Sequence, residues 1–153
     1  MQILSLALAK SGQHGNDPVG MIYLDSCLVI YAVENDPLFG KPVRDLMTRF
    51  AQHQFAISPL VKLECLVKPM KSGDVALQRY FESALSQLKL LELSDSVFVL
   101  AAQLRARFGL KTPDALHLAC AQHHECTALW TNDERLAQSG HGLAQKFVSL
   151  SVP

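Results

Sequence analysis

Short apolar runs alternate along the chain with longer segments of helical period, and this alternation constrains the fold most. Three runs are continuous and contain β-branched or aromatic residues: 21–24, 55–57 and 128–131. Runs of this kind are typical of strands that are buried on both faces of a parallel sheet. Because helical segments separate them, the pattern predicts an α/β sandwich with a central parallel sheet.

Capping and turn residues predict where the helices begin and end. Ser58-Pro59 and Thr112-Pro113 are typical helix starts, since the hydroxyl can cap a free N–H group and proline needs no donor in the first turn. Pro69 is expected to end the helix that begins at Pro59. The expected helices cover 26–34, 42–53, 59–68, 73–88, 94–109 and 112–124, and further strands are expected at 90–93 and 146–150.

Size and charge limit the possible functions. The 153 residues amount to about one domain. The chain has 14 basic and 14 acidic residues, which excludes a generally basic nucleic-acid clamp and an acidic disordered chain. Four cysteines lie in apolar runs, so reduced thiols in a cytoplasmic protein are expected: Cys27, Cys65, Cys120 and Cys126.

The start of the chain resembles a leader more than a structural element. Residues 3–9 are apolar but lack the basic flank of a secretory signal, and residues 11–20 are rich in turn-forming types. We therefore expect residues 1–20 to be a flexible leader or an over-extended start, and 21–153 to form one domain. No apolar run approaches the roughly 20 residues that cross a bilayer, so no membrane association is expected.

Four acidic residues occupy related positions. Asp25 and Asp133 each follow an expected strand, Asp114 lies in the first turn of a helix, and Glu64 lies one to two turns into another. In a parallel sheet the strand ends and the following helix starts share one edge, so the four can converge. Three of them also fit a capping, turn or helix-dipole role. Glu64 does not, because it lies too deep in an apolar helix and needs a partner or an ion there.

A carboxylate cluster of this kind suits hard cations. Mg²⁺ and Mn²⁺ are commonly held by carboxylates together with substrate phosphate oxygens. One or two such ions can activate a water for in-line attack on a phosphodiester and stabilise the leaving oxygen. The acids therefore point to phosphodiester hydrolysis without a nucleophilic side chain.

The motifs around these acids carry a family resemblance. They read MIYLDSCLVIY at 21–31, SPLVKLE at 58–64, TPDALHLA at 112–119 and TND at 131–133. In order and spacing they resemble those of PIN-domain ribonucleases, in particular the VapC-like toxins of bacterial and archaeal toxin–antitoxin pairs. The resemblance extends from residue 21 to about residue 150.

The resemblance implies a three-layer α/β/α fold, a Mg²⁺- or Mn²⁺-dependent endoribonuclease site, inhibition by a cognate antitoxin, and a homodimer. Position by position, it places the catalytic and metal-binding acids at Asp25, Glu64, Asp114 and Asp133. Small polar side chains that could orient the carboxylates or a water match at Ser26, Thr112, Thr131 and Asn132. Cys27 departs from the family, which often has Asn or Ser there, and is expected to alter hydrogen bonding around the acids.

Basic and apolar residues outside the motifs predict the contacts with partners. Lys62 and Lys111 lie close in sequence to the acids and are expected to contact RNA phosphates. Apolar helix segments offer more hydrophobic surface than a small core needs, so they are expected to form the dimer interface. These residues are Val43, Leu46, Met47, Phe50, Tyr80 and Phe81.

Two other functions fit these residues less well. The histidines and cysteines at 117, 120, 123 and 126 spread over about 180° and about 13 Å of one helix, which disfavours a zinc site. A haloacid-dehalogenase-like phosphatase would need an aspartate where Cys27 stands. Two alternatives stay open: a non-catalytic PIN-like module that binds RNA or protein, and a housekeeping PIN nuclease without an antitoxin.

Overall fold

The computed structural model describes residues 19–140 and 142–146, so most of the expected leader and the end of the expected last strand lie outside the described residues. The elements alternate as the apolar runs predict. In chain order they are β1 (Met21–Leu24), α2 (Ser26–Glu34), α3 (Gly40–Arg49), β2 (Gln54–Ile57), α4 (Pro59–Ser72), α5 (Val75–Ser86), β3 (Lys89–Leu90), α6 (Asp95–Phe108), α7 (Thr112–His123), β4 (Ala128–Thr131), α8 (Glu134–Ser139) and β5 (Ala144–Lys146).

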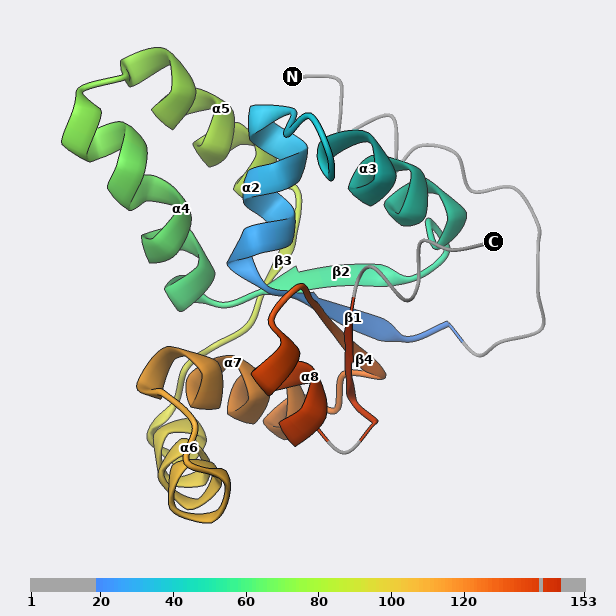
Figure 1. The fold of residues 1–153 in the computed structure, drawn as a ribbon, viewed down its shortest axis with the longest axis vertical. Coiled ribbons are helices and arrows are strands. Elements are labelled where there is room, and N and C mark those ends of the chain that lie inside the picture. The colour runs from blue at the N-terminus through green and yellow to red at the C-terminus, as the bar shows by residue number, and fades with distance from the viewer. Residues whose placement is uncertain (1–18, 141, 147–153) are drawn as a thin grey trace.

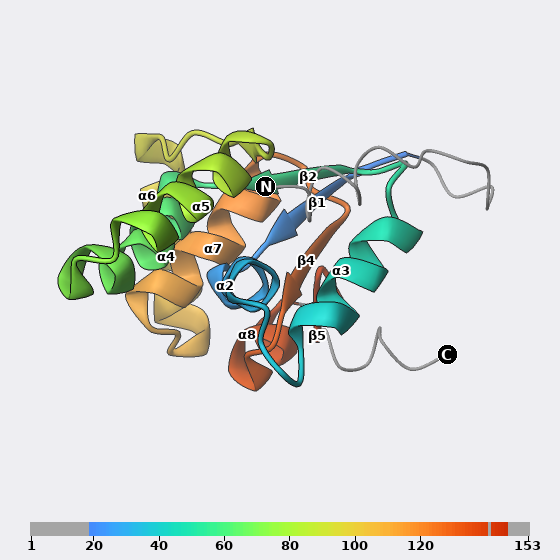
Figure 2. The same cartoon turned by 90° about the horizontal axis from the view of Figure 1, so that it is seen from above.

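All five strands are parallel and lie in the order β3-β2-β1-β4-β5. Figure 1 shows α2 and α3 on one side of this sheet and α6, α7 and α8 on the other, which confirms the three-layer sandwich. The strand order reverses between β1 and β4, and ligands bind open α/β sheets beyond the carboxyl ends of such strands. Seen from above in Figure 2, the carboxyl end of β1 lies close to α2, α4 and α7.

The hydrophobic core fills both sides of the central strands. Tyr23 of β1 and Trp130 of β4 are fully buried, as expected for strands covered on both faces. Trp130 packs edge-on against Phe50, with ring centroids 5.2 Å apart. Among the helices that the structure describes, none is long and apolar enough to span a bilayer.

The residues predicted to form the dimer interface are mostly buried in the core, so this prediction is wrong. Val43, Leu46 and Met47 are buried under α3, and Phe81 is buried under α5. Of the expected set, only Tyr80 is exposed. A helix that packs on its own sheet has the same apolar period as one that packs on a partner, so periodicity could not separate the two.

Several element ends differ from the expected ones. Pro69 does not end α4, which continues to Ser72 and stops at Gly73 with φ 67°. Pro69 thus lies inside the helix, where it has no N–H to donate to the preceding turn, and the packing of α4 outweighs that loss. The helix expected at 42–53 begins at Gly40 and ends at Arg49, and the structure adds α8, which was not expected.

The capping pattern also differs in detail. In α7 the N-cap position is occupied by Lys111, so Thr112 is already helical. Neither Ser58 nor Ser94 caps its helix with its side chain, although both stand at the N-cap position. The third strand covers 89–90 where 90–93 was expected. The last strand begins at 144, two residues earlier than expected, and the rest of its expected range lies outside the described residues.

Candidate active site

Strand β1 delivers Asp25 to the carboxyl edge of the sheet. Its backbone N–H donates to the Trp130 carbonyl at 3.0 Å, which joins the ends of β1 and β4. The carboxylate is buried and accepts from three side chains: Ser26 Oγ at 3.3 Å, Cys27 Sγ at 3.5 Å and Thr131 Oγ1 at 2.7 Å. These donors come from α2 and β4, so both neighbouring elements fix the orientation of Asp25.

Cys27 contributes to this arrangement as a protonated thiol. Burial raises the pKa of Cys27, and the charge of Asp25 raises it further. The thiol therefore keeps its proton and donates it, weakly, to Oδ2 of Asp25. The side chain that departs from the family pattern still supplies a donor to the first acid.

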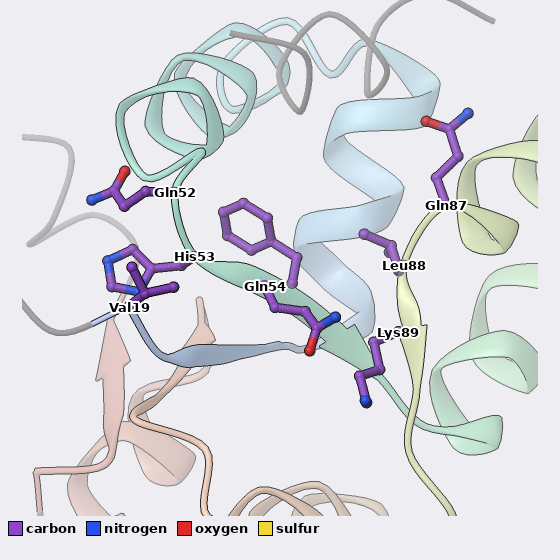
Figure 3. A pocket seen from close by; sticks show the side chains of 8 residues that line it. Val19, Gln52, His53, Gln54, Gln87, Leu88 and Lys89 are labelled. Atoms are coloured by element: carbon purple, nitrogen blue, oxygen red, sulfur yellow. The ribbon is translucent and has the colours of Figure 1, made fainter. Parts of the chain in front are cut away.

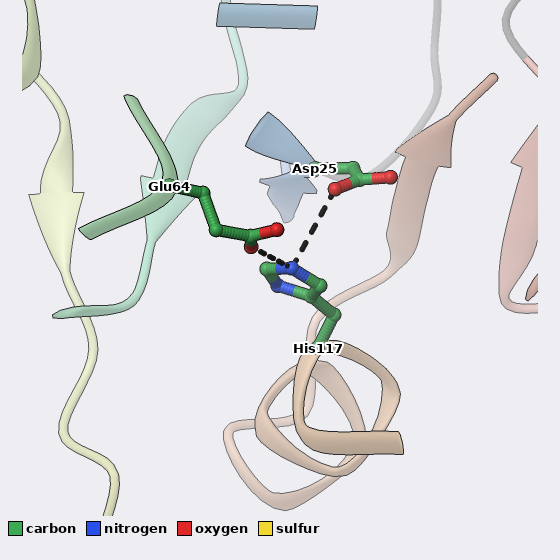
Figure 4. Close-up of side chains that lie close together, drawn as sticks. All are labelled: Asp25, Glu64 and His117. Atoms are coloured by element: carbon green, nitrogen blue, oxygen red, sulfur yellow. Dashed lines mark hydrogen bonds and ion pairs between the residues drawn. The ribbon is translucent and has the colours of Figure 1, made fainter. Parts of the chain in front are cut away.

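His117 links Asp25 to Glu64. Its Nε2 lies 2.6 Å from Oε1 of Glu64 and 3.6 Å from Oδ1 of Asp25, as Figure 4 shows. One ligand atom from each of these three residues lies within 4.8 Å of the others. The two carboxylate groups suit a hard divalent cation, and the imidazole nitrogen beside them is engaged by Glu64.

A buried chain of hydrogen bonds supports the imidazole from the other side. Nδ1 of His117 lies 2.7 Å from the Tyr23 hydroxyl, which lies 2.7 Å from Oγ of Ser58. Ser58, Tyr23 and His117 are all buried. Both ring nitrogens of His117 are therefore engaged, and the hydroxyl of Ser58 contacts Tyr23 instead of capping α4.

The negative charge around His117 determines its protonation. Burial alone would lower the pKa of His117, but the hydrogen bond with Glu64 and the charges of Asp25, Glu64 and Asp114 outweigh this and raise it. The protonated ring is therefore favoured more than in a free histidine. The surroundings of the ring attract a positive charge.

Asp114 lies beside this group. It precedes His117 by three residues on α7, so both side chains share one face of the helix. Burial raises the pKa of Asp114, and the charges of Asp133, Asp25 and Glu64 raise it further. The other three acids thus all lie within electrostatic range of Asp114.

Asp133 lies at the exposed rim of the site. Its Oδ1 accepts from the Leu136 backbone N–H at 3.0 Å and caps α8, so the turn role weighed for it is present. Its own N–H donates to Oγ1 of Thr131 at 3.0 Å. Thr131 therefore connects the loop of Asp133 to Asp25.

The other expected site residues fall into two groups. Ser26 and Thr131 contact Asp25, whereas the Asn132 amide donates to the Tyr31 hydroxyl at 3.2 Å, and exposed Thr112 has no hydrogen bond to the acids within the described ranges. Lys62 is exposed on α4.

Lys111 lines a polar pocket of about 230 Å³ that also includes Asp114 and Arg135. The pocket lies between the α6–α7 loop and α8, next to the acids. Arg105 supports this loop by donating from Nε to the Leu110 carbonyl at 3.0 Å. Arg135 was not expected in the site, because α8 was not predicted.

Sequence reasoning also missed the roles of Tyr23 and Ser58. A usable signal existed for Tyr23, which lies two residues before Asp25 on a strand, and for His117, which follows Asp114 at i+3. For Ser58 the local sequence pointed to a cap, and only the tertiary structure shows its contact with Tyr23.

A larger open pocket of about 550 Å³ lies at the opposite edge of the sheet, near the amino ends of β2 and β3 (Figure 3). Its lining includes Gln52, Gln54 and Gln87, and its histidine, His53, accepts from the Gly20 backbone N–H at 3.1 Å. None of the four acids lines it. This pocket is therefore separate from the acids at the carboxyl edge of the sheet.

Comparisons with known proteins agree with this geometry. Residues 22–141 match the PIN domain family. Ribonuclease VapC46 of Mycobacterium tuberculosis is 31% identical over 132 residues, which cover 85% of this chain and 98% of the relative.

Solved structures share the fold. A toxin–antitoxin complex from Klebsiella pneumoniae superposes with a TM-score of 0.69 at 23% identity, covering 82% of this chain and 97% of that chain. VapBC2 from Rickettsia felis, bound to a DNA fragment from its promoter, gives a TM-score of 0.71 at 18% identity, covering 82% and 98%. With the family match over most of its length and this level of identity to a curated ribonuclease, the chain belongs to the PIN-domain family, in its VapC ribonuclease branch.

Proposed function

We propose that this protein is a divalent-metal-dependent endoribonuclease that acts as the toxin of a toxin–antitoxin pair. One observation carries the proposal: Asp25 and Glu64 bring carboxylate oxygens within 4.8 Å of each other and of a nitrogen of His117, at the carboxyl edge of the sheet. Asp114 lies next to them and carries a raised pKa caused by burial and by the other acids. A bound divalent cation would compensate this concentration of negative charge.

Mg²⁺ or Mn²⁺ is the proposed cofactor, held by Asp25 and Glu64 with Asp114 and Asp133 around it. When bound, such an ion supplies an activated water and stabilises the leaving oxygen of a phosphodiester. The chain itself orients the donors: Ser26, Cys27 and Thr131 fix Asp25 through hydrogen bonds. Asp114 and Asp133 provide further carboxylate oxygens at the mouth of the site.

RNA is the proposed substrate, contacted by basic residues next to the acids. Lys111 and Arg135 line the 230 Å³ pocket together with Asp114, and no ion pair is formed by either cation within the described ranges. Unpaired cations beside a metal-binding cluster suit the phosphates that flank the scissile bond. Lys62, which is exposed on α4 two residues before Glu64, is the proposed second contact for an RNA phosphate.

An antitoxin and a second copy of the chain are the proposed protein partners. The relatives from Klebsiella pneumoniae and Rickettsia felis were solved as toxin–antitoxin assemblies. On α4, Leu63, Val67 and Met70 share one face and are each more than half exposed. We place the homodimer interface on this face, in place of the buried residues that the sequence indicated.

The proposed location is the cytoplasm. All four cysteines are free. Burial raises the pKa of Cys120 to about 12 and that of Cys126 to about 11, so these thiols stay protonated and unreactive. A reducing compartment suits such a set of unpaired thiols.

Cleavage of RNA tests the proposed activity. Wild-type protein should cleave RNA with Mg²⁺ or Mn²⁺ and lose this activity in EDTA, while Asp25→Asn and Asp114→Asn should be inactive. Asp45→Asn is the matched control, since Asp45 is exposed on α3 and pairs with Lys41. Equal cleavage by all four proteins would contradict the proposal. Tight metal binding without turnover on any RNA would favour a non-catalytic PIN-like module instead.

The toxin role needs a separate test. Induction of the wild-type chain should arrest bacterial growth, and Asp25→Asn should not. RNA cleavage without growth arrest would favour a housekeeping nuclease.

A further inference from the structure

We propose that His117 is a positioning residue that, held by Tyr23 and Ser58, fixes the Glu64 carboxylate for a bound divalent cation. The inference rests on the metal-binding part of the proposed function and concerns residues outside the four acids. Tyr23 and Ser58 act only through His117, and neither lies within hydrogen-bond distance of a carboxylate in the described structure.

The chemistry of the contacts fixes the direction of the hydrogen bond at Glu64, and the protonation of His117 fixes the direction of the others. Glu64 is a pure acceptor when ionised, so Nε2 of His117 must donate to it across their 2.6 Å contact. In the neutral ring Nδ1 is then an acceptor, which requires the Tyr23 hydroxyl to donate to it. Since that hydroxyl has a single proton, Ser58 must donate to the Tyr23 oxygen. In the neutral ring, the order Ser58 to Tyr23 to His117 to Glu64 satisfies every member. In the protonated ring, Nδ1 donates to the Tyr23 oxygen and Tyr23 donates to Ser58, and in both states Nε2 donates to Glu64.

Burial fixes the Ser58 end of this hydrogen-bond chain and leaves its Glu64 end accessible to solvent. Ser58, Tyr23 and His117 are buried and come from three separate elements, whereas the Glu64 side chain is 31% exposed. A long, partly exposed glutamate on α4 would otherwise sample several rotamers. The contact with His117 engages Oε1 and leaves Oε2 with no hydrogen-bond partner among the described residues. The free oxygen is thus held ready for a cation, which lowers the ordering cost of binding.

Metal affinity measured without RNA tests the proposal. Mn²⁺ binding to metal-free protein should be followed by calorimetry and by the electron paramagnetic resonance signal of free Mn²⁺. Loss of a group that orients a metal ligand typically costs 10–100-fold in affinity, so we expect His117→Ala to fall in that range and Tyr23→Phe near about 10-fold. His117→Gln keeps a donor near Nε2 and should restore part of the affinity.

A double-mutant cycle separates positioning from general stability. If Tyr23 acts through Glu64, Tyr23→Phe should have no further effect on Mn²⁺ affinity in a Glu64→Gln background. Ser58→Ala should weaken binding, whereas Ser94→Ala should not, because Ser94 Oγ is also buried but has no hydrogen-bond partner among the residues that the structure describes. In nitrogen-15 NMR spectra, Tyr23→Phe should change the chemical shifts of both ring nitrogens of His117.

The outcomes separate this proposal from the proposed function. Unchanged Mn²⁺ affinity in folded His117→Ala and Tyr23→Phe, or additive effects in the cycle, would overturn the positioning role. Should Tyr23→Phe fail to fold, Ser58→Ala and His117→Gln still decide the question. Protein that shows all the expected Mn²⁺ effects but cleaves no RNA would overturn only the nuclease assignment.

Discussion

Oγ1 of Thr131 donates a 2.7 Å hydrogen bond to Oδ2 of Asp25, although 106 residues separate the two in the chain. Oγ1 of Thr131 also accepts a hydrogen bond from the Asp133 backbone N–H at 3.0 Å. This fully buried threonine therefore connects the ends of β1 and β4 where the strand order reverses.

Replacing Thr131 by valine, which has the same shape, should destabilise the protein. The change leaves a buried carboxylate oxygen and a backbone N–H without their partners, so the free energy of unfolding should fall by about 1–3 kcal/mol. Urea denaturation measures the difference. Thr48→Val is the control, because the exposed Thr48 hydroxyl only donates to the Arg44 carbonyl and its loss should change stability by less than about 0.5 kcal/mol. Equal effects of the two variants would contradict the role given to Thr131.

Stability of the metal-free protein should depend on pH through His117 and Asp114. Both have a pKa raised in the folded state, so each contributes stability that is present below its unfolded pKa and lost as pH rises through its folded pKa. Because the pKa of an unfolded histidine is about 6.5, the free energy of unfolding in EDTA should decrease as pH rises above that value.

Urea denaturation between about pH 5.5 and 8 tests this expectation. His117→Gln should flatten the decrease, and His53→Gln, outside the acid cluster, should not. Stability that rises with pH across this window would show that the acids do not act on His117 as described.

The positions of Asp25 and Asp114 could be predicted from sequence because each depends on local structure. An apolar run defines the strand that ends before Asp25, and Thr112-Pro113 defines the helix start that carries Asp114. The parallel sheet then places both at one edge. Local pattern and topology together were sufficient for these acids.

The contacts of His117 could not be predicted in this way. The i+3 spacing from Asp114 indicates that His117 lies near the acids, but its partners Glu64 and Tyr23 lie 53 and 94 residues away and could not be identified from the local pattern. Arg135 was missed for a related reason: the short helix α8 lies after Asp133, where the sequence indicated only a turn. Contacts between distant segments needed the three-dimensional structure.

A divalent cation should stabilise the folded protein through the acids. A ligand at 100 times its Kd adds about 2.7 kcal/mol when it binds only the folded state, so Mn²⁺ should raise the Tm and EDTA should reverse the rise. Differential scanning calorimetry measures both. Asp25→Asn should abolish the shift, while Asp45→Asn should keep it, since Asp45 lies on α3 and pairs with Lys41. A shift of the same size in Asp25→Asn would place the ion elsewhere.

Lys111 and Arg135 should contribute to RNA affinity through phosphate contacts. Both line the pocket that includes Asp114, and neither forms an ion pair within the described ranges. In an Asp25→Asn background, which prevents cleavage, Lys111→Gln and Arg135→Gln should each weaken RNA binding. Each lost phosphate contact should also reduce the slope of log K against log salt by about 0.7 for single-stranded RNA.

Fluorescence anisotropy at several salt concentrations measures both quantities. Lys71→Gln is the control, because Lys71 is exposed near the far end of α4 and lies outside this pocket. Equal salt slopes for Lys111→Gln, Arg135→Gln and Lys71→Gln would mean that the pocket does not contact phosphates. A reduced slope for the first two alone would place the RNA backbone between α7 and α8, directly beside the acids.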